Sequence, residues 1–367
     1  MFRAKSSPGS LDSSGEPKSV KSVLDFKNKL HMSSYGNLHS YSYLACAYLK
    51  FLAFGRALNF PLVLHVQTQS FCNARCSVCP YPVMSKKLPQ GAMEWDLFIK
   101  IANEAASEPM LSTFACTLQN EPLLDKRIFD CVRHFKGINR YKKTKIVTNG
   151  ELLDRYSLSD IIQSDLDCLT VSLNAQSRDV YMKVNQGLDY DRVMRNISSL
   201  LSDKTTRRKL TLNFLNTRIN SSEVCEAVLD WRKKGIKTRL VEMSNRAGSL
   251  ERYENFRPEK RYYGRNIPSR LRSRLISGLG RLVGCSLPFH QMAMLFNGDV
   301  IVCCQDWNRD TVVGNVRNSS LKEIWNSAKM NQIRLSILRK KYNEVKSCQA
   351  CSLAKPYEMA WHLVSLR

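Results

Sequence analysis

From residue 62 to residue 243 the chain alternates short runs rich in β-branched residues with longer stretches in which apolar residues recur every three or four positions. The short runs predict strands, and the longer stretches predict the helices between them. The predicted strands are Leu62–Val66, Thr113–Leu118, Lys145–Thr148, Cys168–Leu173, Thr211–Leu215 and Thr238–Met243. The predicted helices lie near residues 94–106, 125–136, 152–164, 190–202 and 221–234.

Strands that alternate with helices in this way pair in parallel through right-handed crossovers. Six strand–helix units are fewer than the eight of a closed barrel, which takes about 250 residues. We therefore expect an α/β fold in the form of a partial (β/α)6 barrel like an incomplete TIM barrel. Functional residues should then lie at the carboxyl ends of its strands.

The segment before the predicted barrel differs from it in composition. Residues 1–22 are rich in Ser, Lys, Gly and Pro, which predicts a flexible tail. The apolar stretch Tyr41–Phe54 contains Lys50 and is too short to span a membrane, so it predicts a docking or interfacial helix. We expect an N-terminal extension over residues 1–60 and the core barrel over residues 61–250. No secretory signal follows Met1, which favours a cytoplasmic location.

Beyond residue 250 the pattern changes. Residues 251–284 are rich in arginine and interrupted by prolines, which predicts a basic connector. A small cysteine-rich domain is expected over residues 285–355, followed by a C-terminal tail over residues 356–367.

The 367 residues carry a net charge of +24, since Lys and Arg number 56 and Asp and Glu only 32. This balance favours anionic partners, and one interpretation is a basic iron–sulfur protein that binds nucleic acid. The charge is spread along the chain, however, which is more typical of a solvated surface and disfavours a nucleic-acid partner. Hydrophobic residues make up 43% of the chain, which excludes a largely disordered protein.

Three cysteines, Cys72, Cys76 and Cys79, follow the first predicted strand with the spacing Cys-x3-Cys-x2-Cys. Three thiolates neither close a tetrahedral zinc site nor ligate all four irons of a cubane cluster. The spacing therefore favours a [4Fe–4S] cluster with one open iron, on which a small molecule can bind. A zinc site with a remote fourth ligand and a chance grouping are the alternatives.

With this triplet on the loop after the first strand, the sequence resembles the radical S-adenosylmethionine enzymes. The resemblance extends to Gln119-Asn120-Glu121-Pro122, which stands where the family has a Gly-Gly-Glu-Pro motif that holds the methionine amino group. The Glu-Pro pair matches and the two glycines do not. The resemblance implies amine contacts by Glu121, and leaves the backbone geometry of Gln119 and Asn120 open.

Three further positions match places where family members contact the ribose and the carboxylate of S-adenosylmethionine. They are Thr148-Asn149-Gly150 after the third strand, Ser172 and Asn174 after the fourth, and Arg218 after the fifth. Arg218 is expected to pair with the carboxylate as a two-pronged donor. Each of these positions also has a simpler interpretation as turn or cap chemistry.

The resemblance implies a mechanism and a set of cofactors. The open iron chelates S-adenosylmethionine, an electron from the cluster cleaves the sulfonium, and the resulting 5'-deoxyadenosyl radical removes a hydrogen atom from the substrate. The electron would come from a donor such as flavodoxin or ferredoxin. The protein itself orients the reactants and excludes water, while the cofactor supplies the chemistry.

A second set of cysteines lies near the C-terminus: Cys285, Cys303, Cys348 and Cys351. Residues Phe296–Val302 predict a hairpin around an Asn-Gly turn, which would bring Cys285 and Cys303 together. Four cysteines supply all the protein ligands that a zinc ion or an iron–sulfur cluster needs. By spacing alone, a structural zinc site is therefore an alternative to an iron–sulfur cluster.

This segment resembles the auxiliary-cluster domains called SPASM and twitch that follow many radical S-adenosylmethionine cores. A full SPASM domain has three further cysteines, which are absent after Cys351, so the shorter twitch form with one auxiliary [4Fe–4S] cluster fits better. The matching motifs are Cys303-Cys304-Gln305-Asp306, Gly314-Asn315-Val316 and Leu321–Asn326.

The remaining cysteines are not assigned to a cluster. Cys304 follows Cys303 directly, and consecutive residues of a strand point to opposite faces, so we assign Cys303 as the ligand. The others are expected to be buried small hydrophobic residues, namely Cys46, Cys116, Cys131, Cys168 and Cys225.

An auxiliary cluster beside the barrel mouth could accept an electron from a substrate radical, which makes a two-electron oxidation feasible. The leading hypothesis is an oxidoreductase that oxidises a small-molecule alcohol of the amino-sugar or cyclitol type, because the twitch layout resembles that of a family member with such a reaction. The alternative is radical modification of a peptide or protein, such as epimerisation, cross-linking or maturation. Domain layout does not choose between these substrates.

Overall fold

The computed structural model describes residues 46–51, 53–55, 57–259 and 284–354. Both predicted tails and most of the predicted basic connector lie outside the described residues. None of the helices that the structure describes combines the length and the apolar character of a membrane-spanning helix.

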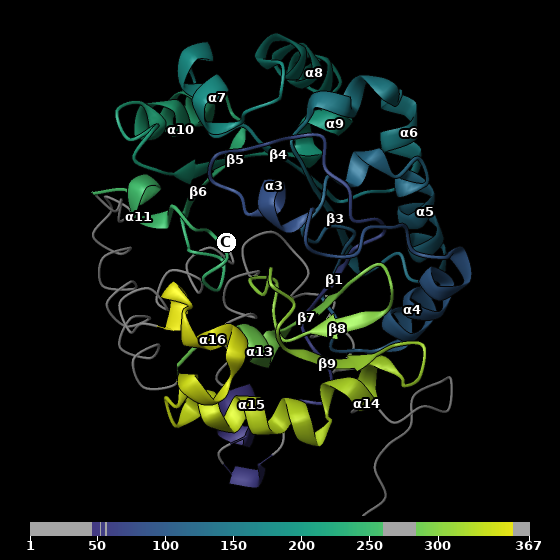
Figure 1. The fold of residues 1–367 in the computed structure, drawn as a ribbon. Coiled ribbons are helices and arrows are strands. Elements are labelled where there is room, and N and C mark those ends of the chain that lie inside the picture. The colour runs from purple at the N-terminus through teal and green to yellow at the C-terminus, as the bar shows by residue number, and fades with distance from the viewer. Residues whose placement is uncertain (1–45, 52, 56, 260–283, 355–367) are drawn as a thin grey trace, which may run out of the picture.

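The centre of the molecule is a nine-stranded sheet with the order β6-β5-β4-β3-β2-β1-β7-β8-β9 (Figure 1). Neighbouring strands from β1 to β6 are parallel, as the pattern predicts. The strands are β1 Val63–Val66, β2 Thr113–Ala115, β3 Lys143–Thr148, β4 Cys168–Ser172, β5 Leu210–Asn216, β6 Lys237–Glu242, β7 Gln291–Met294, β8 Asp299–Ile301 and β9 Val312–Asn315. The prediction of an α/β fold with an open, partial barrel is confirmed.

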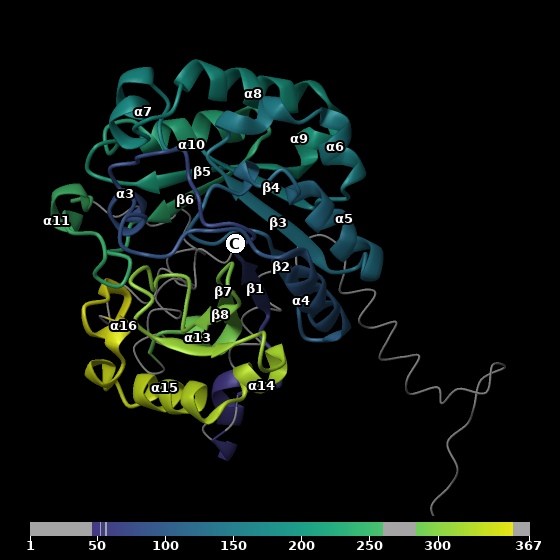
Figure 2. The ribbon, with the colours of Figure 1, turned by 45° about the vertical axis from the view of Figure 1, so that its right-hand side comes forward.

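Helices form an arc outside the parallel strands (Figures 1 and 2). They are α4 Trp95–Ser107, α5 Ile128–Ile138, α6 Leu158–Gln163, α7 Arg178–Val184, α8 Tyr190–Ser202, α9 Lys204–Lys209 and α10 Val224–Lys233. The shorter elements of this part are α3 Tyr81–Met84, η1 Pro122–Leu124, η2 Glu151–Arg155 and α11 Tyr253–Phe256. The single helix predicted over residues 152–164 is instead two, because Ser157 and Asp160 form a capping box that begins a new helix. The short helices α7 and α9 were not predicted.

The two faces of the parallel sheet differ in chemistry. The outer face is apolar and packs on the helices; the Phe114 ring of β2, for example, lies 4.1 Å from the Phe135 ring of α5. Since side chains alternate along a strand, the next positions face the interior of the barrel. These inner positions include His65, Lys145 and Arg239, so the interior carries positive charge.

The predicted cysteine-rich segment follows the barrel and continues its sheet. Strand β7 pairs in parallel with β1, from Val63 opposite Gln291 to Val66 opposite Met294. Without β7, strand β1 would be an edge with unpaired backbone groups, and the pairing satisfies them. The predicted hairpin is confirmed: β7 and β8 are antiparallel, and Gly298 in the turn has a φ of +91°.

The helices of this segment lie on its outer side: α13 Leu287–His290, α14 Leu321–Trp325, α15 Ala328–Leu338, η3 Tyr342–Glu344, α16 Lys346–Gln349 and η4 Ser352–Ala354. The N-terminal stretch also packs here. Residues 46–51 are helical, and the rings of Tyr48 and Phe51 lie 4.5 and 5.6 Å from the ring of Phe289 in α13. Trp325 Nε1 donates to the carbonyl oxygen of Leu58 at 2.7 Å.

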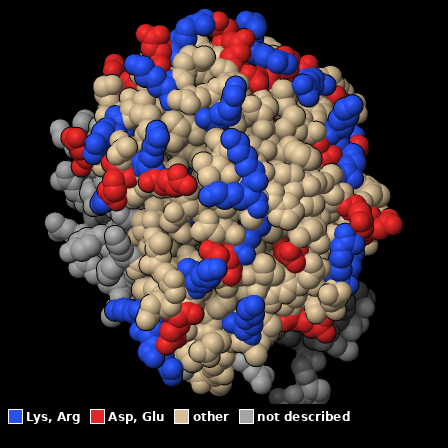
Figure 3. Space-filling model, viewed as in Figure 1, with Lys and Arg blue, Asp and Glu red and all other residues tan. Residues whose placement is uncertain are grey.

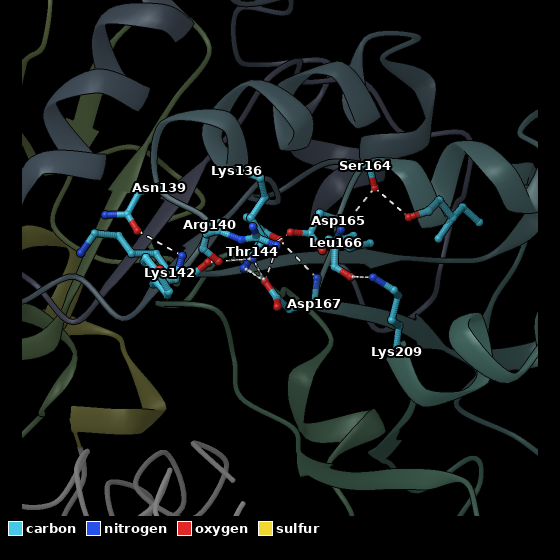
Figure 4. A network of polar contacts seen from close by, with 12 residues as sticks. Lys136, Asn139, Arg140, Lys142, Thr144, Ser164, Asp165, Leu166, Asp167 and Lys209 are labelled. Carbon is cyan, nitrogen blue, oxygen red and sulfur yellow. Dashed lines mark hydrogen bonds and ion pairs between the residues drawn. The ribbon is translucent and has the colours of Figure 1, made fainter. Parts of the chain in front are cut away.

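A polar network fixes the amino ends of β3 and β4, at the end of the barrel opposite the cysteine loop (Figure 4). Lys136 Nζ lies 2.7 Å from the Asp167 carboxylate and donates to two backbone carbonyls. The same carboxylate accepts from the backbone nitrogen of Thr144 at 2.7 Å. Lys142 and Lys209 also donate to backbone carbonyls. Every buried amine of this network therefore has partners.

Arg334 of α15 joins the C-terminal helices in the same way. Its guanidinium lies 4.1 Å from the ring of Trp325 and is fully buried. It donates to the carbonyl oxygens of Pro288 and Trp325 at 2.9 and 2.8 Å and to Asn331 Oδ1 at 2.8 Å. One side chain thus connects α13, α14 and α15.

We predict that Arg334→Leu lowers the free energy of unfolding by about 3 kcal/mol, because it leaves buried carbonyls without donors. Urea unfolding followed by circular dichroism measures this change. The matched control is Arg339→Leu, at the exposed end of the same helix, which should change stability by less than about 0.5 kcal/mol. Equal effects of the two substitutions would contradict this role for Arg334.

Candidate functional site

The loop with Cys72, Cys76 and Cys79 lies between β1 and α3, at the carboxyl end of the parallel strands. Backbone hydrogen bonds hold it on the segment after α7: Arg75 N donates to Gln186 O at 2.7 Å. Burial raises the pKa of Cys72 to about 12, and it also raises the pKa of Cys76 and Cys79. The neighbouring thiols raise the pKa of Cys76 further, so the three sulfurs lie near one another.

Three partly buried thiols on one loop suit an iron–sulfur cluster, because a metal replaces the proton that burial otherwise retains. Across the described residues, no group of three His, Cys, Asp or Glu side chains is placed to hold a single metal ion.

The segment after β2 contains a glycine-like backbone at one of the two positions where the resemblance places a glycine. Gln119 has a φ of +52°, in the left-handed region that glycine adopts without strain. Its Nε2 donates to the carbonyl oxygen of Asp306 at 2.9 Å, which ties this segment to the C-terminal part. Gln119 Oε1 and Asn120 Nδ2 are buried and have no hydrogen-bond partner among the described residues. Such orphaned polar atoms suit a polar ligand at this place.

Glu121 is fully enclosed and its carboxylate supports the surrounding loops. It accepts from Thr148 Oγ1 at 2.6 Å, from the backbone nitrogen of Asn149 at 2.7 Å and from that of Leu123 at 3.1 Å. Burial raises its pKa to about 7, although these hydrogen bonds favour the charged form. Pro122 begins η1 directly behind it. Contact of Glu121 with an amino group stays a prediction.

Ser172 and Asn174 lie at the end of β4. Asn174 has a φ of +63° and its side chain is occupied: Oδ1 accepts from Leu215 N at 3.0 Å, and Nδ2 donates to Asn185 Oδ1 at 2.9 Å. The same Asn185 oxygen lies 4.0 Å from the sulfur of Cys76. Asn174 therefore positions the cysteine loop through Asn185, a residue that sequence reasoning missed because no motif marks it.

Arg218 lies on the loop after β5, and its side chain is 51% exposed. Its Nε lies 3.9 Å from the carboxylate of Glu259, and its backbone nitrogen donates to Phe256 O at 2.8 Å. The structure therefore places Arg218 at the surface, beside α11. Its contact with a ligand carboxylate stays a prediction.

The second set of cysteines lies together. Burial raises the pKa of Cys303, and the thiols of Cys304, Cys348, Cys285 and Cys351 raise it further. The sulfur of Cys304 also lies 3.7 Å from Oε1 of Gln291 on β7. The assignment of Cys303 rather than Cys304 as the ligand stays a prediction.

The other cysteines are mixed in burial. Cys116 and Cys131 are buried as expected, and Cys168 and Cys225 are partly buried. The expectation is wrong for Cys46, which is exposed because the buried side of its helix is formed by Ala47, Tyr48 and Phe51.

Two residues after β6 lie beside the cysteines, and sequence reasoning assigned neither. Asn245 Nδ2 donates to Ala350 O at 2.6 Å, and its Oδ1 accepts from Ser352 N at 2.8 Å, on either side of Cys351. Burial raises the pKa of Cys79, and the positive charge of Arg246 opposes that rise. The same charge opposes the rise at Cys304. Arg246 thus lies near Cys79 of the first set and near Cys304.

Two family models match the chain. Residues 66–212 match the Radical SAM superfamily, and residues 285–352 match the SPASM iron–sulfur cluster-binding domain. The two matches together cover more than half of the chain. The protein therefore belongs to the radical S-adenosylmethionine enzymes and carries a C-terminal SPASM domain.

Two relatives with similar sequences differ in how much of their length the chain matches. The chain is 25% identical over 190 residues to GTP 3',8-cyclase of Chlorobaculum tepidum, which covers 52% of the chain and 55% of the relative. It is 20% identical over 290 residues to the S-adenosyl-L-methionine-dependent 2-deoxy-scyllo-inosamine dehydrogenase of Niallia circulans, which covers 79% of the chain and 92% of the relative. The chain thus spans about half of the cyclase but nearly all of the dehydrogenase.

Solved structures share the fold. BtrN in complex with AdoMet and 2-DOIA is similar with a TM-score of 0.55 and 18% identity, over 80% of this chain and 93% of BtrN. SuiB of Streptococcus suis bound to the precursor peptide SuiA is similar with a TM-score of 0.62 and 16% identity, over 86% of this chain and 78% of SuiB.

The raised pKa of Glu121 predicts a pH dependence of stability. Its pKa is about 7 in the folded protein and 4.5 in an ordinary environment, so the folded chain binds this proton more tightly. The resulting stabilisation is complete below about pH 4.5 and is lost as the pH rises to about 7. The difference in unfolding free energy between wild type and Glu121→Gln should therefore fall by about 3 kcal/mol over this range.

Urea unfolding of both proteins at several pH values between 4.5 and 8 measures this difference. A constant difference across the range would show that Glu121 does not titrate near neutrality.

Proposed function

We propose that the chain generates a 5'-deoxyadenosyl radical from S-adenosylmethionine and oxidises a small-molecule alcohol of the amino-sugar or cyclitol type. When bound, a [4Fe–4S] cluster with an open iron supplies the electron that cleaves the sulfonium. The observation that carries the proposal is the presence of two cysteine sets, with Asn245 bonded on either side of Cys351 and Arg246 near Cys79 and Cys304.

The proposed ligands of the first cluster are Cys72, Cys76 and Cys79. The residues proposed to contact S-adenosylmethionine are Gln119, Asn120, Glu121, Pro122, Ser172, Asn174 and Arg218. The orphaned amide atoms of Gln119 and Asn120 support this site, since a bound ligand would satisfy them. The occupied side chains of Glu121 and Asn174 favour a supporting role, in which they hold the loops around the ligand.

The proposed ligands of one auxiliary [4Fe–4S] cluster are Cys285, Cys303, Cys348 and Cys351. In an alcohol oxidation, the radical takes a hydrogen atom from the carbon, the hydroxyl loses a proton, and one electron remains to be removed. An auxiliary cluster in the twitch arrangement is the proposed acceptor of that electron. Similarity in fold and length to the 2-deoxy-scyllo-inosamine dehydrogenase supports this choice.

Radical modification of a peptide is the second candidate. It is favoured by the similarity to SuiB, which was solved with a precursor peptide, and by the net charge of +24, which would attract an acidic peptide. The two candidates share the first cysteine set and differ only in what enters the barrel.

A nucleic-acid partner is disfavoured. On the face shown in Figure 3, Lys and Arg side chains alternate with Asp and Glu and do not gather into one basic surface. We also propose, as the sequence suggests, a cytoplasmic location, flavodoxin or ferredoxin as the electron donor, and the boundaries 61–250 and 285–355 for the core barrel and the cysteine-rich part.

Anaerobic reconstitution tests the proposed cofactors. The wild type should hold about eight irons, as two [4Fe–4S] clusters require, and should cleave S-adenosylmethionine to 5'-deoxyadenosine under a strong reductant. Cys76→Ala should lose about half of the iron and all cleavage. Iron analysis and chromatography of the nucleoside measure these results. Zinc in place of iron, or an absence of cleavage by the wild type, would contradict the proposed function.

The adjacent pair Cys303 and Cys304 provides a matched comparison for the second cluster. Cys303→Ala should retain only about four irons, because it removes a ligand of the auxiliary cluster. Cys304→Ala should retain about eight, since its sulfur points towards Gln291. The reverse result would exchange the two assignments.

A further inference from the structure

Two cationic side chains face the interior of the barrel from different strands. Lys145 is on β3, where its neighbours Thr144 and Ile146 are buried on the other face. Arg239 is on β6, whose preceding residue Thr238 bonds to Arg232 of the outer helix α10. The two charges lie close enough that Arg239 contributes, after burial, to lowering the pKa of Lys145 to about 8. At neutral pH both side chains still carry their charge.

Neither cation has a partner. Lys145 and Arg239 form no hydrogen bond or ion pair through their side chains with any residue in the described part of the chain. The buried amines at the end of the same barrel differ, because Lys136, Lys142 and Lys209 all donate to carbonyl or carboxylate oxygens. Both residues are partly buried, and a charge held away from bulk water without a partner lowers stability, which a bound anion would offset.

In the described part of the barrel, no acidic side chain of the surrounding strands neutralises the charges of Lys145 and Arg239. Among the described strands β1 to β7, the positions that face inward hold no Asp or Glu. Burial, followed by the charge of Lys145, lowers the pKa of His65 to about 4, so its ring is neutral. The thiol of Cys168 lies 3.5 and 3.9 Å from the hydroxyls of Thr170 and Thr211.

An unsatisfied acceptor lies beside Arg239. Asn213 on β5 is the register partner of Arg239, and its Oδ1 is buried without a hydrogen-bond partner among the described residues. This amide oxygen suits a donor on a ligand, such as a hydroxyl.

We propose that Lys145 and Arg239 bind an anionic group of the substrate, a carboxylate or a phosphate, while Asn213 accepts a hydrogen bond from a substrate hydroxyl. The inference rests on the proposed function, and it narrows the substrate class to a polyhydroxylated compound that carries an anion. Lys145 lies three residues before the end of β3, about 10 Å below the carboxyl end of the strand. A sugar acid or sugar phosphate spans that distance to the mouth of the barrel.

The test uses the full chain, reconstituted anaerobically, and two probes. Isothermal titration calorimetry measures the binding of inorganic phosphate and, separately, of D-glucuronate, and the stronger probe identifies the anion. Lys145→Gln and Arg239→Gln should each weaken the binding of that probe at least about tenfold, because each removes a charged donor. Lys145→Arg keeps the charge and should bind within about threefold of the wild type.

The matched controls are Lys143→Gln and Lys237→Gln, two residues earlier on the same strands, where both lysines are exposed. Both control variants should bind the probe as tightly as the wild type, because each removes a charge from the surface and leaves the barrel interior unchanged. If Lys145→Gln does not fold, as iron content shows, Arg239→Gln decides the question. The inference is overturned if the wild type binds neither probe, if both inner variants bind normally, or if the controls weaken binding equally.

This outcome is separable from that of the proposed function. Cleavage of S-adenosylmethionine by the wild type in the absence of substrate decides whether the chain is active in that reaction. The anion titrations decide only what the barrel interior holds.

Discussion

The arrangement of the site depends on the parallel pairing of β7 with β1. This pairing, from Val63 opposite Gln291 to Val66 opposite Met294, makes the C-terminal segment part of the barrel sheet. The first cysteine loop follows β1, and the chain after β8 returns so that Cys304 lies next to Gln291 on β7. Two cysteine sets far apart in sequence thereby border one interior, which a C-terminal domain attached by a flexible connector would not achieve.

Polar residues that make no direct contact with a cysteine sulfur determine the shape of the site. Glu121 holds the loops after β2 and β3 through three hydrogen bonds, and Asn245 fixes the segment around Cys351. Because these groups are buried or partly buried and most of their partners are backbone atoms, small changes would leave backbone groups unsatisfied. The interior differs: Lys145 and Arg239 remain without partners, as expected for groups that await a ligand.

The sequence predicts local features well and spatial ones poorly. Strands β1 to β6 are predicted because their β-branched runs are regular, and the cysteine triplet is recognisable from its spacing alone. The residues Gln291–Met294 do not indicate that their strand pairs with β1. The two strands are far apart in the sequence, and their pairing depends on the fold rather than on local sequence. The left-handed conformation of Gln119 is not predictable from the sequence either, because residues other than glycine rarely adopt a positive φ. Lys145 is visible as a residue of β3, but its lack of a partner is a property of the folded barrel.

The central claim is that S-adenosylmethionine binds one cluster, held by Cys72, Cys76 and Cys79, while a second cluster has all its ligands from the chain. Electron paramagnetic resonance of the reduced, reconstituted protein tests this directly. Addition of S-adenosylmethionine should change the signal of one cluster and leave that of the other unchanged, because only one has an open iron. A spectrum with two cluster signals, neither of which responds to S-adenosylmethionine, would contradict the account.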